Sequence, residues 1–331
     1  MNNKANNYIL DFTHVYCDED MKDNPRFHWI DCSDIEGCDL YCSDEAAAEI
    51  RKRIMPYGIK GIHFIDSGNF HYVTKITTDQ IKRPFSLVVF DHHTDMQRPL
   101  VDGMMSCGDW AGLVLDQNPN LKQLILIGPE AADIFQIDAV RKDRLLTFSA
   151  EELKNGTARK KSANILSGVP FYISIDKDVL STRFTETNWN QGDMSLDMLE
   201  HLLGIILSHE TVCGIDICGE CQPDLPLPEY MEGEEKNERI NHELIDFFDH
   251  IFLTIPHPFL IIDDIIPVCK LILIKHCCII EIIRINRSIV PALGIEICLI
   301  IRIIKFSSMA GIYFVKSETA FIRCQPIQVT I

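Results

Sequence analysis

The sequence predicts an α/β domain built on a doubly wound, mainly parallel sheet. Short, continuous apolar runs such as Ser86–Phe90 and Phe171–Ile175 recur along the chain, as expected of strands that are buried on both faces. These runs alternate with helical patterns, which is the order of successive β-α-β units. A length of 331 residues is enough for one large α/β domain or two smaller ones.

The predicted elements follow from these patterns in chain order. The strands are Tyr8–Phe12, Gly61–Ile65, Ser86–Phe90, Leu121–Ile127, Leu145–Phe148, Phe171–Ile175 and Val212–Ile217. The helices are Asp44–Met55 with Ser43 as N-cap, Ser195–Ser208, and Glu238–Phe252 with Asn237 before it. The stretch from Glu229 to Glu238 (EYMEGEEKNE) is predicted as a solvated acidic loop.

The charge balance argues against nucleic acid as a partner. The chain has 31 Lys and Arg against 48 Asp and Glu, a net charge of -17, whereas binding to a phosphate backbone needs a basic face. The N-terminal residues show no basic segment followed by an apolar one, and the 13 cysteines are irregularly spaced. Both observations favour the cytoplasm, a reducing compartment, over a secreted disulfide scaffold.

The composition changes after residue 256. Residues 257–331 carry eight Lys and Arg against five Asp and Glu, a net of +3, so residues 1–256 hold -20, and 22 of the last 75 residues are isoleucine. We therefore predict an α/β domain over 1–256 and an Ile-rich extension outside the core fold over 257–331. Charges such as Asp263, Lys270 and Glu281 argue against a membrane-spanning helix. An oligomerisation or membrane-surface segment is the alternative for this extension.

Two acidic motifs directly follow predicted strands. Asp91, His93 and Asp95 come after Ser86–Phe90, and Asp176 and Asp178 come after Phe171–Ile175. In an extended chain residues two apart face the same side, and ligands bind beyond the carboxyl ends of parallel strands. Gathered carboxylates need cations or protons, and an oxygen-rich set suits Mn²⁺, Mg²⁺ or Fe²⁺ better than structural zinc. The alternative is that these residues only cap a helix and form surface turns.

These motifs carry a family resemblance. Four motifs in this order are similar to those of the ureohydrolase superfamily of arginase, agmatinase and formiminoglutamase: Gly68-Asn69-Phe70-His71, Asp91-x-His93-x-Asp95, Ser174-x-Asp176-x-Asp178 and Glu220-x-x-Pro223. The resemblance covers roughly residues 60 to 225. It implies a three-layer α/β/α sandwich around a mainly parallel sheet of about eight strands, in agreement with the pattern of elements.

The resemblance also implies the chemistry. It assigns His71, Asp91, Asp95 and Asp176 to one Mn²⁺ and Asp91, His93, Asp176 and Asp178 to a second, so that Asp91 and Asp176 bridge. Hydroxide between the two metals would attack a guanidino or related C=N carbon and expel an amine. Glu220 would pair with the cationic group of a small guanidino or amidine-type substrate, because a carboxylate and a guanidinium can bond in a fork. Homo-oligomers occur in such families.

The sequence departs from the family pattern at several points. Phe70 stands where the family has an aspartate, Asp178 is not followed by Asp-Pro, and Glu220 lies one residue further from Asp216 than usual. The family's proton-shuttling histidine is absent from residues 105–112, which offer Asp109 and Trp110. Asp109 is a candidate proton carrier or, equally, the N-cap of a helix that begins near Trp110.

Other hypotheses stay open beside the hydrolase. His92 is predicted to point away from the metals, and the Cys218-x-x-Cys221 pair is interpreted as coincidental. A metal-binding or regulatory protein that lacks amidinohydrolase activity is the main alternative function. A DHH-type phosphoesterase is less favoured, because that family has its Asp-x-Asp element before the DHH string, whereas here Asp176 and Asp178 follow it.

Overall fold

The computed structural model describes residues 6–16, 19–101, 103–222 and 225–254, together with three strands between residues 278 and 323. The chain divides into two compact units, Met1–Phe259 and Leu260–Ile331. None of the described helices combines the length and the apolar composition that crossing a membrane requires. We retain 1–256 and 257–331 as the proposed domains.

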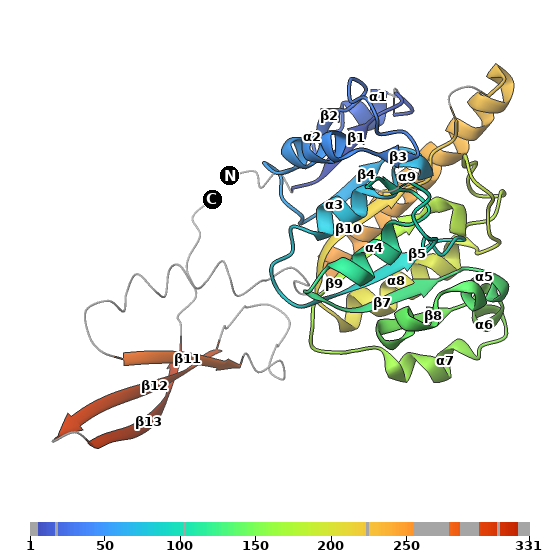
Figure 1. Ribbon diagram of the computed structural model, residues 1–331. Helices are drawn as coiled ribbons and strands as arrows, with labels where there is room; N and C mark the ends of the chain where they lie inside the picture. Colours follow the sequence, from blue (N-terminus) through green and yellow to red (C-terminus); the bar gives the residue numbers. More distant parts are fainter. Residues whose placement is uncertain are drawn as a thin grey trace. The chain divides into compact units, whose positions relative to one another are not determined.

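The first unit contains an eight-stranded sheet in the order β2-β1-β4-β10-β9-β5-β7-β8 (Figure 1). Every neighbouring pair runs parallel, which confirms the predicted sheet. Its strands are β1 (Tyr8–Asp11), β2 (His28–Asp31), β4 (Ile62–Ile65), β5 (Phe85–Phe90), β7 (Leu121–Ile127), β8 (Leu145–Phe148), β9 (Phe171–Asp176) and β10 (Val212–Cys218). A separate two-stranded ladder pairs β3 (Tyr41–Cys42) with β6 (Met105–Ser106).

Helices cover both faces of the sheet, which makes three layers (Figure 1). One apolar core contains residues of α2 (Asp44–Ile54), α3 (Val73–Thr78) and α4 (Trp110–Gln117), and the other contains residues of α8 (Leu196–His209) and α9 (Leu227–Thr254). The shorter helices are α1 (Glu19–Lys22), α5 (Ala131–Gln136), α6 (Ala150–Lys154) and α7 (Ala158–Lys161), with 3-10 turns η1 (Gly68–Phe70), η2 (Ala139–Arg144), η3 (Ser162–Asn164) and η4 (Lys177–Val179).

The predicted N-cap of α2 is confirmed, because the Ser43 side chain accepts a hydrogen bond from the Ala46 backbone N–H at 3.1 Å. Edge strand β2 was not predicted. Its sequence, HWID, is not a continuous apolar run, and only one of its four residues is fully buried.

The prediction of an acidic loop over 229–238 is wrong, because these residues belong to α9. The helix buries a stripe three to four residues apart that begins with Gly233 and Asn237 and continues through Ile240 and Leu244. The Asn237 side chain bonds the backbone N–H and C=O of Glu186 at 2.9 and 2.7 Å. It therefore anchors the interior of a helix rather than preceding one.

The second unit contains an antiparallel sheet in the order β11-β12-β13. Its strands are β11 (Cys278–Arg284), β12 (Cys298–Met309) and β13 (Ile312–Arg323). The sequence predicted no strands here, because isoleucine-rich runs interrupted by single charges show no regular alternation.

Candidate metal centre

Six predicted ligands lie together where β5 and β9 end. They are His71, Asp91, His93, Asp95, Asp176 and Asp178. The two strands are neighbours, with Phe90 paired to Ile175, so the residues that follow them meet at one edge of the sheet. His71 comes from the turn after β4, just past η1.

The first group centres on His71. Its Nδ1 lies 3.2 Å from Asp91 Oδ2, 3.1 Å from Asp95 Oδ2 and 3.5 Å from Asp176 Oδ2. All four residues are buried. The arrangement matches the set of residues that the resemblance implied for one metal ion.

The second group contains Asp91, His93 and Asp178. His93 Nδ1 lies 2.8 Å from Asp178 Oδ2 and 3.5 Å from Asp91 Oδ1. Asp91 therefore presents one oxygen to each group, as a bridging ligand would. Asp176 directs Oδ2 to the first group, while its Oδ1 accepts the Asp178 backbone N–H at 2.9 Å.

The alternative of surface turns is wrong, although turns are present. The Asp91 side chain accepts the His93 backbone N–H at 2.5 Å, and Asp176 caps η4. Asp91, Asp176 and Asp178 are nevertheless at most 3% exposed. Turn formation alone does not explain three carboxylates removed from water at one place.

The electrostatics of the cluster favour a bound cation. Burial raises the pKa of Asp176 and Asp178, and the neighbouring carboxylates raise it further. Burial lowers the pKa of His93, but its hydrogen bonds with Asp178 and Asp91 outweigh this and raise the pKa to about 12. His71 Nδ1 is buried and is aligned with no described group for a hydrogen bond. An unpartnered imidazole nitrogen facing three carboxylates fits a divalent metal ion.

Asp95 is held by two unusual features. Its backbone has a φ of 49°, in the left-handed region that residues with a Cβ seldom adopt. The Trp110 indole N–H donates to Asp95 Oδ2 at 2.6 Å, and the rings of Trp110 and His71 lie 4.6 Å apart. Trp110 was predicted only as a helix start, yet it orients a candidate ligand.

The sequence predictions for neighbouring residues have different outcomes. Asp109 occupies the N-cap position of α4, but its two oxygens accept bonds from Ser106 N and Oγ at 2.9 and 2.6 Å rather than from the helix. The His92 backbone N–H donates to Asp178 Oδ1 at 3.0 Å, and its ring belongs to none of the ligand groups among the described residues. Phe70, which replaces the family's aspartate, stacks on Phe12 at 4.1 Å in the core.

Hydrogen bonds beneath the site fix the orientation of His71. His71 Nε2 lies 2.9 Å from Ser174 Oγ, which lies 3.0 Å from Thr74 Oγ1. Thr74 Oγ1 donates a hydrogen bond to Asp216 Oδ2 at 2.9 Å. Asp216 Oδ1 lies 2.8 Å from His63 Nδ1 and accepts a hydrogen bond from the Tyr172 hydroxyl at 2.7 Å. Since these groups are buried, the network holds Nδ1 toward the carboxylates.

Cys218 was not predicted as part of the site. Its Sγ lies 3.3 Å from Asp176 Oδ2, and His71, Asp176 and Cys218 form a third possible ligand group. The signal available in the sequence was its place at the end of a strand, two residues after Asp216. Cys221, the other half of the pair, belongs to none of the groups found among the described residues.

Glu220 does not stand free for a substrate. It forms an ion pair with the Lys177 ammonium, and the side chains of both residues are at most 4% exposed. Asn241 of α9 links the pair, because it accepts from Lys177 and donates to Glu220 at 2.9 Å each. The carboxylate that the resemblance assigned to a substrate cation is thus neutralised by the chain itself.

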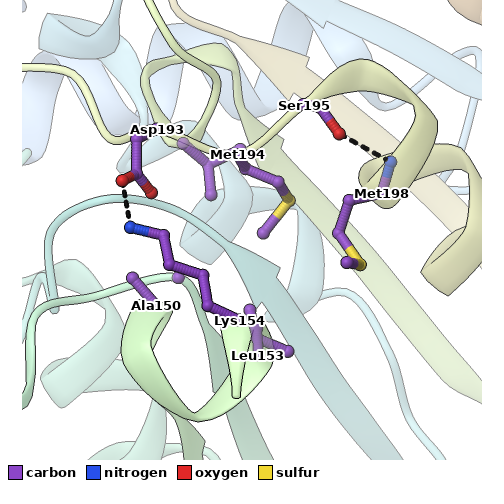
Figure 2. Close-up of a pocket in the computed structure, with 9 residues that line it drawn as sticks. Ala150, Leu153, Lys154, Asp193, Met194, Ser195 and Met198 are labelled. Carbon is purple, nitrogen blue, oxygen red and sulfur yellow. Dashed lines mark hydrogen bonds and ion pairs between the residues drawn. The ribbon is translucent and has the colours of Figure 1, made fainter. Parts of the chain in front are cut away.

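Two cavities adjoin this edge of the sheet. A cleft of about 970 Å³ is lined by His93 and Asp95 of the cluster and by charged residues that include Arg98, Asp133 and Arg141. A smaller cavity of about 160 Å³ lies near Val179 and between α6 and α8. Figure 2 shows its methionines Met194 and Met198 facing Lys154 and Leu153, with Lys154 paired to Asp193. The first cleft is the one that reaches the candidate ligands.

Comparisons with known proteins agree with this architecture. A model of the arginase family matches residues 14–227. An uncharacterized protein from Thermotoga maritima is 31% identical over 244 residues, which is 74% of this chain and 90% of that protein.

Solved structures share the fold at low sequence identity. Formimidoylglutamase from Bacillus subtilis has a TM-score of 0.52 at 18% sequence identity. The alignment covers 70% of this chain and 73% of the formimidoylglutamase chain. Agmatine ureohydrolase of Thermoplasma volcanium also has a TM-score of 0.52, at 14% identity, over 74% of this chain and 89% of its own.

Proposed function

Because the chain belongs to the arginase family, we propose that it is a binuclear-metal hydrolase that cleaves a non-peptide C–N bond of a guanidino, amidine or imino compound. The observation that carries this proposal is the buried cluster around His71, in which Asp91 presents one oxygen to each of two ligand groups. Such an arrangement removes charge from water, at a cost in free energy that bound cations would offset.

The chain's residues divide between two ion positions. His71, Asp91, Asp95 and Asp176 would hold one ion, and Asp91, His93 and Asp178, with Asp176, the other. Mn²⁺ is the candidate ion, because the donors are mainly carboxylate oxygens and the family resemblance implies it. Two such ions, when bound, would lower the pKa of a water molecule held there and would polarise a C=N group.

The surrounding residues set up the site. Trp110 holds Asp95 by a 2.6 Å hydrogen bond, and Ser174 holds His71 at 2.9 Å. His93 and Asp95 line the cleft of about 970 Å³, so a substrate can approach the ion positions from there. Its charged lining suits a small polar molecule.

Lys177 blocks the access of a cationic substrate group to Glu220. A guanidinium could reach Glu220 only by displacing a buried ammonium that also bonds Asn241. Recognition of the substrate's remote group is therefore assigned to the cleft rather than to Glu220.

Asp109 remains a hypothetical proton carrier, with both of its oxygens hydrogen-bonded to Ser106. The seven cysteines between residues 32 and 221 are free thiols, which supports the proposed cytoplasmic location.

The deciding experiment measures metal content together with ammonia, urea or amine release on a panel of guanidino and formimino compounds. Wild type should bind two ions per chain and turn over one compound class. Asp91→Asn should lose metal at both positions, whereas Asp193→Asn, an exposed carboxylate beside Lys154, should retain both.

The other outcomes identify the alternatives. Two bound ions without turnover on the whole panel would favour a metal-binding or regulatory protein, and hydrolysis of nucleotides instead would favour a phosphoesterase. If Asp91→Asn leaves metal content unchanged, the proposed site is wrong.

A further inference from the structure

We propose that Cys218 is a thiolate ligand of the ion held by His71 and Asp176. The inference rests on the proposed metal centre and adds a sulfur donor to it. One ion position would then carry sulfur as well as nitrogen and oxygen, while the position of His93 and Asp178 would not.

The strand pairing brings Cys218 to the cluster. Cys218 is the last residue of β10 and is paired in register with Asp176, the last residue of β9. Its Sγ lies 3.3 Å from Asp176 Oδ2, which lies 3.5 Å from His71 Nδ1. These three atoms lie within 4.8 Å of one another, and Cys218 is 1% exposed.

The backbone after Cys218 keeps this approach close. Gly219 has a φ of +97°, and a Cβ built there would meet Asp176 Oδ1 at 2.5 Å. Since no other residue fits so close to the carboxylate without a shift, glycine allows the end of β10 to press against Asp176. The position of the thiol beside the carboxylate is therefore built into the strand end.

A second observation comes from the imidazole. His71 Nε2 is bonded to Ser174, whereas the buried Nδ1 has no aligned hydrogen-bond partner among the described residues. Nδ1 and Sγ thus face the same Asp176 oxygen from two different elements. The thiol and the imidazole nitrogen are therefore both placed to bind one ion together with Asp176.

The ligation step is balanced without a redox partner. The S–H bond breaks, a sulfur–metal bond forms, and the proton passes to solvent, as for other thiol ligands. A soft donor favours Zn²⁺, Co²⁺ or Fe²⁺ over Mn²⁺. The ion beside Cys218 would therefore differ in preference from the ion beside His93 and Asp178.

Cobalt absorption tests the proposal directly. Metal-free protein is loaded with Co²⁺ to constant stoichiometry under anaerobic conditions, and the near-ultraviolet spectrum is searched for the sulfur-to-cobalt charge-transfer band. Wild type should show the band. Cys218→Ser should bind Co²⁺ without it, and the matched control Cys221→Ser, which alters the other cysteine of the pair, should keep it.

Every outcome bears on the proposal. Wild type that binds two Co²⁺ without the band overturns it even if no variant folds, and leaves the metal centre standing. A band that persists in Cys218→Ser also overturns it, because another cysteine is then the source. Failure to bind any Co²⁺ overturns both the ligand and the centre.

Metal preference gives a second readout on the same variants. In chelator competition, Cys218→Ser should lose about 10- to 100-fold in Zn²⁺ affinity, the range seen when groups that support a metal site are removed, and should lose less in Mn²⁺ affinity. Equal losses for the two metals would indicate that Cys218 acts only through packing and would contradict the assignment.

Discussion

Replacing Lys177 by methionine should destabilise the α/β domain strongly. The Lys177 side chain is fully buried, and the Glu220 carboxylate that it neutralises is 4% exposed. Methionine preserves much of the length of the side chain but removes the ammonium, so that Glu220 is left buried and without a cation. Removing one partner of a buried ion pair costs about 3–5 kcal/mol.

The magnitude can be converted to a melting temperature. For a domain of this size each kcal/mol corresponds to about 2–4 °C, so Lys177→Met should lower the Tm by about 6 to 20 °C. The double variant Lys177→Met/Glu220→Gln should recover most of the loss, because a buried pair replaced on both sides is often close to neutral. Asn241 can still donate to the glutamine carbonyl.

The assay is urea and thermal unfolding in the presence of a chelator, so that metal loss from neighbouring Asp176 does not contribute. Lys154→Met is the matched control. Its ion pair with Asp193 has side chains 60% and 55% exposed, and such pairs contribute about 0–1 kcal/mol. The reasoning is refuted if Lys177→Met loses no more unfolding free energy than Lys154→Met. It is also refuted if the double variant Lys177→Met/Glu220→Gln is no more stable than Lys177→Met.

Three further predictions concern the ligands, pH and the C-terminal residues. Trp110→Phe removes the hydrogen bond to Asp95 and should weaken metal binding about 10- to 100-fold, as measured by chelator competition; unchanged affinity would show that Asp95 needs no support. Burial raises the pKa of Asp66 from 3.8 to about 6, so its contribution to stability is complete below pH 3.8 and is lost as the pH rises through 6. Relative to Asp66→Asn, wild type should therefore lose roughly 3 kcal/mol of unfolding free energy between about pH 4 and pH 7. If urea unfolding gives the same pH dependence of stability for both proteins, the prediction is wrong. Truncation after residue 256 should leave circular dichroism and metal content unchanged; loss of soluble, metal-loaded protein would overturn the proposed domain boundary.

Strands that are buried on both faces could be predicted from the sequence, because the residues in them are mostly apolar. Strands such as β5 and β9 are fully buried, so they must be apolar throughout, and their residues stand out as continuous runs. The aspartates placed two apart at their ends were predicted to share a face. They meet in the structure because parallel strands end at the same edge.

The first turns of helix α9 were not predicted from the sequence, because the exposed face of the helix has the composition of a loop. The first turns of α9 are rich in glutamate because one side of the helix is in water. Only the docking of Gly233 and Asn237 against the segment at Glu186 shows that this stretch is helical. Local composition describes the exposed side of such a helix but not its buried side.

The sequence by itself predicted the parallel sheet and five of the ligand candidates, because burial and strand ends are local properties of the chain, and the family resemblance added His71. Only the tertiary structure decided the surroundings of those ligands. Cys218 reaches Asp176 because β10 lies next to β9, and Glu220 is neutralised because α9 brings Asn241 to Lys177. Such contacts depend on which distant segments become neighbours, and no pattern within a single segment encodes that choice.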